Sequence, residues 1–173
     1  MAVPITTDVI FGLRALERGT TATYVDWATG MLEKGADSRS LRILAGLELS
    51  ISVFEAKDYF LKAIAELGIR EPEKSHAITG YAAYLAERLI DNLIPQETVI
   101  MRLSELCCVS GYPANLMIWY ELYDALRDIE YGGEPWSYPG LTKQNAPGII
   151  AQEAAKFLIS VGGSRTDPST SSG

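Results

Sequence analysis

The chain has few of the residues from which metal centres and catalytic centres are usually built. It contains one histidine, His76, and two adjacent cysteines, Cys107 and Cys108, among 173 residues. A zinc site needs about four ligands at characteristic spacing, and neighbouring cysteines are poorly placed to bridge each other. The sequence also contains no GxGxxG, GxxxxGK[ST] or GxSxG motif. We therefore expect no metal, no cofactor, no disulfide and no catalytic residue.

Positive charge is also scarce, with 15 Lys and Arg against 22 Asp and Glu, for a formal net charge of −7. Such a chain is repelled by nucleic acid and by anionic membrane surfaces. No apolar run reaches the length of a membrane span, and the first residues lack the basic start and apolar run of a signal peptide. Together with the free thiols, these features predict a cytoplasmic protein.

Alternation with period two is absent, so no sheet is expected. Caps of Ser, Thr, Asp or Pro and terminal glycines instead predict an all-α fold, a single domain of antiparallel helices over residues 1–162. Gly30 and Gly46 fall inside helical patterns, which indicates close helix contacts or local breaks. We expect residues 163–173 to form a disordered tail, for which a vector-derived origin is one interpretation. The eight expected helices are 7–18, 21–34, 38–47, 53–67, 73–93, 95–109, 113–131 and 145–159.

A faint internal similarity links the two halves of the chain. Residues 24–35 resemble 81–92, and residues 40–49 resemble 98–107. A third pair is formed by 58–68 and 120–132. Two interpretations remain open: a duplicated three-helix unit, as in stacked helical repeats, or the general likeness of amphipathic helices.

One segment combines acidic and aromatic residues. Glu121, Asp124 and Asp128 are spaced i, i+3, i+7 and share one helical face. Three carboxylates on one face bind a divalent cation, act as an acid–base pair, or form a solvated acidic stripe. The solvated stripe is the favoured interpretation, because the Glu-x-x-His pattern of di-iron helix bundles is missing.

The aromatic residues of this segment lie mostly outside its predicted core face. At 100° per residue, Tyr120 and Tyr131 lie nearly opposite the core, and Tyr123 lies on a flank. The following loop carries Trp136 and Tyr138. Either this loop folds back over Tyr120 and Tyr131, or some rings stay exposed beside the acids.

Three stretches of the sequence resemble a group of small helical bacterial proteins without an assigned activity. They are YVDWATGMLEKGADSRSLRILAGL (24–47), FEAKDYFLKAIAELGI (54–69) and GYPANLMIWYELYDALRDIEYGGEPWSYPGLTKQNA (111–146). The resemblance covers most of residues 10–160, and it implies no functional residue. By analogy with other small acidic helical proteins, it suggests an immunity protein that binds and blocks a toxin.

The leading hypothesis is a non-enzymatic binding module that engages a basic protein partner. Acidic side chains steer such a partner, and Tyr and Trp are enriched at interface hot spots. One alternative is a small helical enzyme or ligand-binding protein that uses Glu121, Asp124, Tyr120 and His76. Another is a scaffold that forms a homo-oligomer. The predicted partner-binding residues are Tyr120, Glu121, Tyr123, Asp124, Asp128, Tyr131, Glu134, Trp136 and Tyr138.

Overall fold

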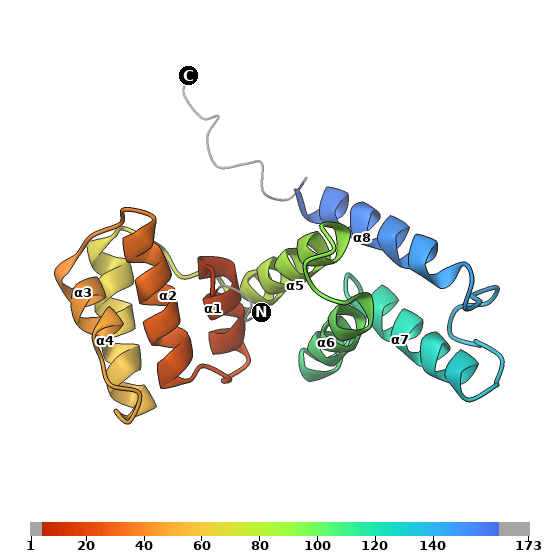
Figure 1. The fold of residues 1–173 in the computed structure, drawn as a ribbon, viewed down its shortest axis with the longest axis horizontal. Coiled ribbons are helices and arrows are strands. Elements are labelled where there is room, and N and C mark those ends of the chain that lie inside the picture. The colour runs from red at the N-terminus through yellow and green to blue at the C-terminus, as the bar shows by residue number, and fades with distance from the viewer. Residues whose placement is uncertain (1–4, 163–173) are drawn as a thin grey trace, which may run out of the picture. The chain divides into compact units, whose positions relative to one another are not determined.

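The structure, a computed structural model, describes residues 5–162 of the chain, so the predicted disordered tail lies outside it. Over the described residues the chain folds into eight α-helices and no strand. Figure 1 labels these helices on the ribbon. The prediction of an all-α fold is therefore confirmed. The helices are α1 (Thr7–Ala15), α2 (Thr21–Glu33), α3 (Arg39–Ala45), α4 (Val53–Glu66), α5 (Lys74–Ile90), α6 (Gln96–Val109), α7 (Met117–Glu130) and α8 (Ala146–Gly162).

The helix starts follow from hydroxyl caps. The side chain of Thr6 accepts from the amide of Val9, and that of Ser38 accepts from Leu41. At α2, Thr20 and Thr23 form a reciprocal capping box in which each side chain accepts from the other's backbone amide. This box uses threonine where the usual pattern has Glu or Gln, which is why the sequence pattern did not reveal it.

Several helix ends are fixed by a residue in the left-handed conformation. After α7, Gly132 has φ 79° and Gly133 donates to Asp128 O, which is the hydrogen-bond pattern of a Schellman motif. The first helix stops at Ala15 rather than at residue 18, because Glu17 adopts φ 58°. The seventh begins at Met117 rather than at 113, because residues 114–116 form a turn in which Leu116 donates to Pro113 O.

The glycines inside helical patterns behave differently from one another. A Cβ added to Gly30 would meet no atom within 4 Å, so this glycine marks no close helix contact. Gly46 is the C-cap of α3 and therefore marks a break. The close approach lies instead at Gly12 in α1, where an added Cβ would stand 2.8 Å from the Cγ of Tyr81.

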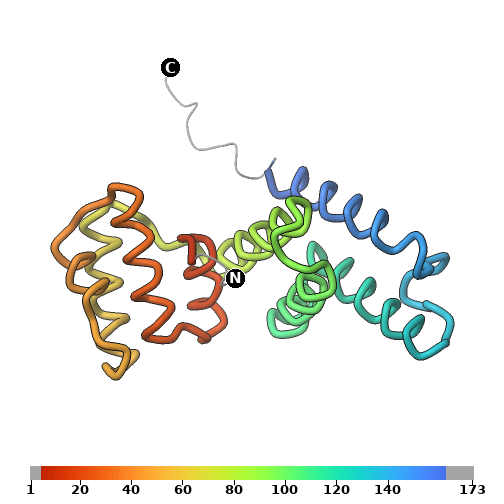
Figure 2. The backbone as a smooth tube through the Cα atoms, in the orientation of Figure 1, coloured from red at the N-terminus to blue at the C-terminus, as the bar shows by residue number. Residues whose placement is uncertain are grey.

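The described helices group into two compact units, Met1–Tyr81 and Ala82–Gly173, with the division inside α5. In the first unit, α2 packs against both α3 and α4, which also pack against each other. In the second unit, the most extensive pairing is α6 with α7, and α7 also contacts α8. Figure 2 traces the backbone through the helices of each unit. In a duplicated unit, α5, α6 and α7 would correspond to α2, α3 and α4. The contact of α6 with α7 matches that of α3 with α4. Among the described residues, however, α5 contacts neither α6 nor α7 as extensively as α2 contacts α3 and α4.

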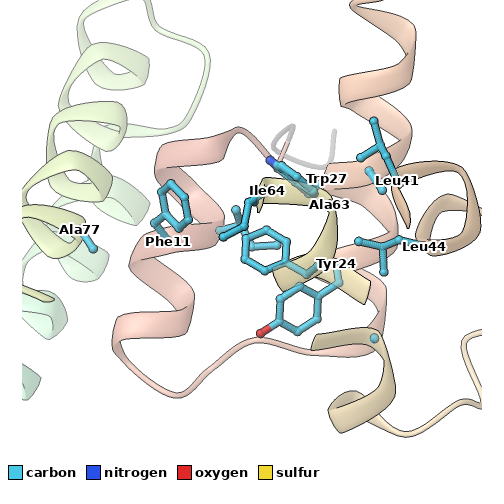
Figure 3. Packing of buried hydrophobic residues seen from close by; sticks show 12 residues of the cluster. Phe11, Tyr24, Trp27, Leu41, Leu44, Ala63, Ile64 and Ala77 are labelled. Carbon is cyan, nitrogen blue, oxygen red and sulfur yellow. The ribbon is translucent and has the colours of Figure 1, made fainter. Parts of the chain in front are cut away.

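The core of the first unit is built around Phe60 of α4, which is fully buried. Its ring contacts Trp27 (centroids 4.7 Å apart), Tyr24 (5.2 Å) and Phe11 (6.1 Å). The guanidinium of Arg14 lies 5.0 Å from the Phe60 centroid, within cation–π range. Figure 3 shows side chains of α1, α2, α3 and α4 converging on this cluster.

Polar groups at the edge of this core are paired. The indole nitrogen of Trp27 donates to Thr7 Oγ1 at 3.2 Å, so the buried ring keeps its hydrogen bond. Glu66 at the end of α4 accepts from the hydroxyl of Ser40 (2.7 Å) and from its amide (2.9 Å). These two hydrogen bonds tie α4 to the first turn of α3, and they lower the pKa of Glu66.

The second unit has its own apolar core. Trp119 of α7 is fully buried and meets Phe157 of α8 edge to face, with centroids 5.6 Å apart. The side-chain amide of Gln96, at the start of α6, donates from Nε2 to Pro147 O at 3.2 Å, which joins the N-terminal turns of α6 and α8. Leu141, in the segment between α7 and α8, is also buried.

Two glycine-to-alanine substitutions should have opposite effects on stability. Gly12→Ala forces a methyl group against Tyr81 and should lower the free energy of unfolding by about 1–3 kcal/mol, the usual cost of overpacking. Gly30→Ala has free space and should raise it by about 0.5–1 kcal/mol through helix propensity. Urea denaturation of both variants checks this pair, and a stabilised Gly12→Ala would show that the contact of α1 with Tyr81 is wrong.

The hydrogen bonds between Ser40 and Glu66 should give stability that depends on acid pH. Because the pKa of Glu66 is lowered in the folded state, this stability is present above the ordinary glutamate pKa of about 4.3 and is lost as pH falls through the folded-state pKa. Ser40→Ala should therefore lower the Tm at pH 7, and its difference from the parent should shrink below about pH 4. Thermal melts from pH 3 to 7 measure this, and an equal difference at every pH would contradict it.

Candidate functional site

Helix α7 places the predicted acidic and aromatic residues around a buried stripe. Trp119, Leu122 and Ala125 form the buried side of the helix. The remaining positions are half-buried or exposed, including Ile118 and Ile129, which the helical spacing places on the core face. The predicted partner-binding residues therefore surround α7 on several sides, and the structure separates them into groups with different surroundings.

The acidic flank of α7 is half-buried rather than freely solvated. Asp124 accepts a short hydrogen bond from the hydroxyl of Ser137, which holds the segment after α7 against this flank. Glu121 and Asp128 are also half-buried. Since Asp124 is half-buried and already accepts a hydrogen bond within the chain, it is less accessible to another molecule than a residue of a solvated acidic stripe would be.

Tyr138 is held by the same folding back of the chain. It is half-buried, and its hydroxyl donates to Glu153 Oε1 of α8 at 3.4 Å. Burial raises the pKa of Tyr138, with further contributions from the charges of Glu153 and Glu121. Tyr138 therefore stays neutral at physiological pH and has a structural partner inside the protein.

Tyr120 and Tyr123 also have partners within the chain. Tyr120 packs edge to face against Tyr112, with ring centroids 5.4 Å apart, so the segment before α7 partly covers it. Tyr123 lies 5.9 Å from the guanidinium of Arg127, which also lies 5.8 Å from the ring of Tyr131. A hydrogen bond to Tyr131 is the largest cause that raises the pKa of Arg127. The arginine is therefore positioned by two aromatic rings.

Tyr131 and Trp136 remain exposed. Their side chains are 77% and 78% accessible, so the loop after α7 does not cover Tyr131. Of the two arrangements that the sequence left open, the structure thus shows exposed rings at these positions. Glu130 and Glu134 are exposed as well. We call Glu130, Tyr131, Glu134 and Trp136 together the Trp136 surface.

The turn after α7 explains why these rings point outward. Gly132 and Gly133 reverse the chain, and the amide of Trp136 then donates to Glu134 O at 2.9 Å. Ser137 and Leu141 turn back toward the protein, through a hydrogen bond to Asp124 and through burial respectively. Trp136 therefore lies at the outside of a loop whose later residues are anchored.

A cleft of about 630 Å³ lies beside the Trp136 surface, among α6, α7 and the start of α8. We call it the α7 cleft. Tyr123 and Tyr131 belong to its wall, and buried or half-buried apolar side chains line its interior. This cleft was not predictable from the sequence, because its lining residues are spread from position 96 to position 150.

The residues considered for catalysis or metal binding have ordinary surroundings. His76 is exposed in the first turn of α5 and belongs to the first unit, whereas Tyr120, Glu121 and Asp124 belong to the second. Cys107 is buried, and burial is the main cause that raises the pKa of its thiol, which makes it a poor nucleophile. Over residues 5–162, no group of three His, Cys, Asp or Glu side chains is placed to hold a metal ion.

None of the helices in the described part of the chain combines the length and the apolar character that crossing a membrane requires. Comparison of the chain with protein families, with curated proteins and with solved structures gives no match in any of the three. The resemblance to small helical bacterial proteins therefore stays a prediction. A functional conclusion has to rest on the geometry of the chain itself.

Ionic quenching of tryptophan fluorescence should report the charge around Trp136. Of the three tryptophans, Trp27 and Trp119 are fully buried, so a collisional quencher in water reaches mainly Trp136. Because Glu134 and Glu130 are exposed nearby, caesium should quench more effectively than iodide at low ionic strength, where surface charges are weakly screened.

Two variants control this measurement. Trp136→Phe should remove most of the quenchable fluorescence and leave the two buried indoles. Glu134→Lys should shift the preference toward iodide. Equal quenching by the two ions in the parent protein would show that Trp136 does not sit in a negative environment.

Proposed function

We propose that the protein is a non-enzymatic binding module that engages a basic protein partner through the Trp136 surface. The observation that carries this proposal is the exposure of Tyr131 and Trp136 beside two exposed carboxylates. The other aromatic residues of the segment are half-buried or buried. This difference narrows the predicted partner-binding residues to those that are free to contact another molecule.

Exposed aromatic rings favour association with another protein. Burial of such a side chain in an interface contributes about 1.5–3 kcal/mol from its apolar area. Tyrosine and tryptophan are therefore frequent hot spots, especially where surrounding polar residues exclude water. Trp136 also follows Pro135 and lies in a loop anchored by Ser137, so ordering it on binding costs less entropy than in a free loop.

The charge around the rings selects the partner. Residues 117–135 carry five acidic side chains, Glu121, Asp124, Asp128, Glu130 and Glu134, against Arg127, a net charge of −4 within a chain of −7. Glu130 and Glu134 are the two that are exposed. Exposed charges of one sign accelerate encounter with an oppositely charged protein, and this effect weakens with salt. A basic partner fits this pattern.

The resemblance stated from the sequence suggests the biological form of such binding, an immunity-type inhibitor that covers a basic toxin. The structure is compatible with this form, because blocking a partner requires a stable surface and no catalytic group. Inhibition of the captured partner is therefore the property to measure once the partner is identified.

Charge reversal on the Trp136 surface should abolish partner capture. Glu130→Lys with Glu134→Lys removes both exposed carboxylates beside the rings, so we expect at least a tenfold loss of the partner in affinity capture from a lysate of the source organism. In the parent protein the partner should be basic, and its recovery should fall between low and moderate salt.

The matched control is Asp26→Lys with Glu33→Lys on α2. These two residues are also exposed acids, and their replacement changes the net charge by the same amount on the other unit. Capture should be retained in this control. Equal loss in both double variants would show that net charge alone governs capture, and no loss in either would exclude the Trp136 surface.

A further inference from the structure

The α7 cleft has the composition of a site for an apolar side chain. Its interior is lined by Ile100 of α6, Leu126 of α7, and Ala146 and Ile150 of α8. Leu126 is half-buried, and the other three side chains are buried. The volume of about 630 Å³ lies within the range of cavities that hold small organic groups. An apolar group that enters this cleft meets mainly Leu126, because Ile100, Ala146 and Ile150 are already buried in the core.

The rim of the cleft carries charges of both signs. Glu97 and Glu130 supply two carboxylates, while Arg127 and Lys143 supply two cations, and all four are exposed. Arg127 is held against Tyr123 and Tyr131, so its charge is fixed in position. The two pairs of charges balance, so the rim carries no net charge and favours neither a small anion nor a small cation.

A polypeptide segment satisfies such a rim. Its backbone carbonyls accept from arginine and lysine, its basic side chains pair with the carboxylates, and one large apolar side chain fills the interior. The cleft is also continuous with the Trp136 surface, because Tyr131 and Glu130 belong to both.

We infer that the α7 cleft receives an anchor residue of the basic partner: a large aliphatic or aromatic side chain flanked by lysine or arginine. This inference rests on the proposed function and adds the sequence chemistry of the segment that is recognised. Tyr131 then contacts the anchor on one side and the rest of the partner on the other. The partner's basic residues lie next to Glu97 and Glu130.

The test uses a phage-displayed library of random peptides, selected on the immobilised full-length protein. We expect a consensus that contains one large apolar residue beside at least one lysine or arginine. A synthetic peptide with that consensus is then titrated by fluorescence anisotropy against the protein and its variants.

Two variants alter the cleft without altering the Trp136 surface. Leu126→Ala shortens a lining side chain, and Glu97→Lys reverses one rim charge; each should weaken the peptide at least fivefold. Leu61→Ala on α4 is the control for the first, since Leu61 is a partly exposed leucine of the other unit. Thermal melts confirm that each variant is folded.

Two further variants separate this inference from the proposed function. Trp136→Ala tests the Trp136 surface, with Phe54→Ala on α4 as its control, because Phe54 is an exposed aromatic residue of the other unit. Weakening by Leu126→Ala, Glu97→Lys and Trp136→Ala supports both conclusions. Weakening by Trp136→Ala alone overturns the anchor site and keeps the proposed surface.

The other outcomes of these experiments also support or overturn the anchor site. Weakening by the two cleft variants alone supports the anchor site and overturns the role of Trp136. Selection of no peptide, or of peptides without basic residues, overturns the inference. A small molecule that shifts the Tm of the parent protein, but not that of Leu126→Ala, would assign the cleft to a small ligand and would also overturn it.

Discussion

The candidate site depends on how the chain is fastened after α7. The hydroxyl of Ser137 donates to Asp124, and the side chain of Leu141 is buried. These two anchors hold the chain on both sides of Tyr138 and leave residues 134–136 as the outer part of the loop. Without them the segment between α7 and α8 would be a free connection, and neither the position of Trp136 nor the shape of the neighbouring cleft would be defined.

This fastening also divides one stretch of sequence into two functional parts. Asp124 and Tyr138 act inside the protein, where each has a hydrogen-bonding partner. Tyr131 and Trp136 remain available to another molecule. Acidic and aromatic residues that appear equivalent along the chain therefore have different roles, and the helical positions alone do not separate them, because the separation is made by residues outside α7.

Much of the fold was predictable from local signals. Hydroxyl caps and terminal glycines gave the number and order of the helices, since these signals act within one turn of helix. The errors came where two local rules compete. Pro113 suits a first helical turn, yet it begins a separate turn and α7 starts at Met117. The sequence likewise gave no reason to prefer Glu17 over Gly19 as the left-handed residue after α1.

The site was predictable only in part, because it depends on contacts between distant segments. The concentration of acids and rings near α7 was visible in the sequence, whereas the pairing of Ser137 with Asp124 was not. The α7 cleft combines residues such as Glu97 and Lys143, which are 46 positions apart. No periodicity within a single helix brings such residues together, so only the packing of α6, α7 and α8 reveals them.

The contact between Gly12 and Tyr81 has a consequence for related sequences. An added methyl group at position 12 would stand close to the first side-chain atoms of Tyr81, which every residue except glycine possesses. A smaller side chain at position 81 therefore gives no relief, and only a change in helix spacing does. Homologues that keep this arrangement of α1 and α5 should retain glycine at one of the two positions, and this pair can serve to distinguish them from chains that share only the pattern of amphipathic helices.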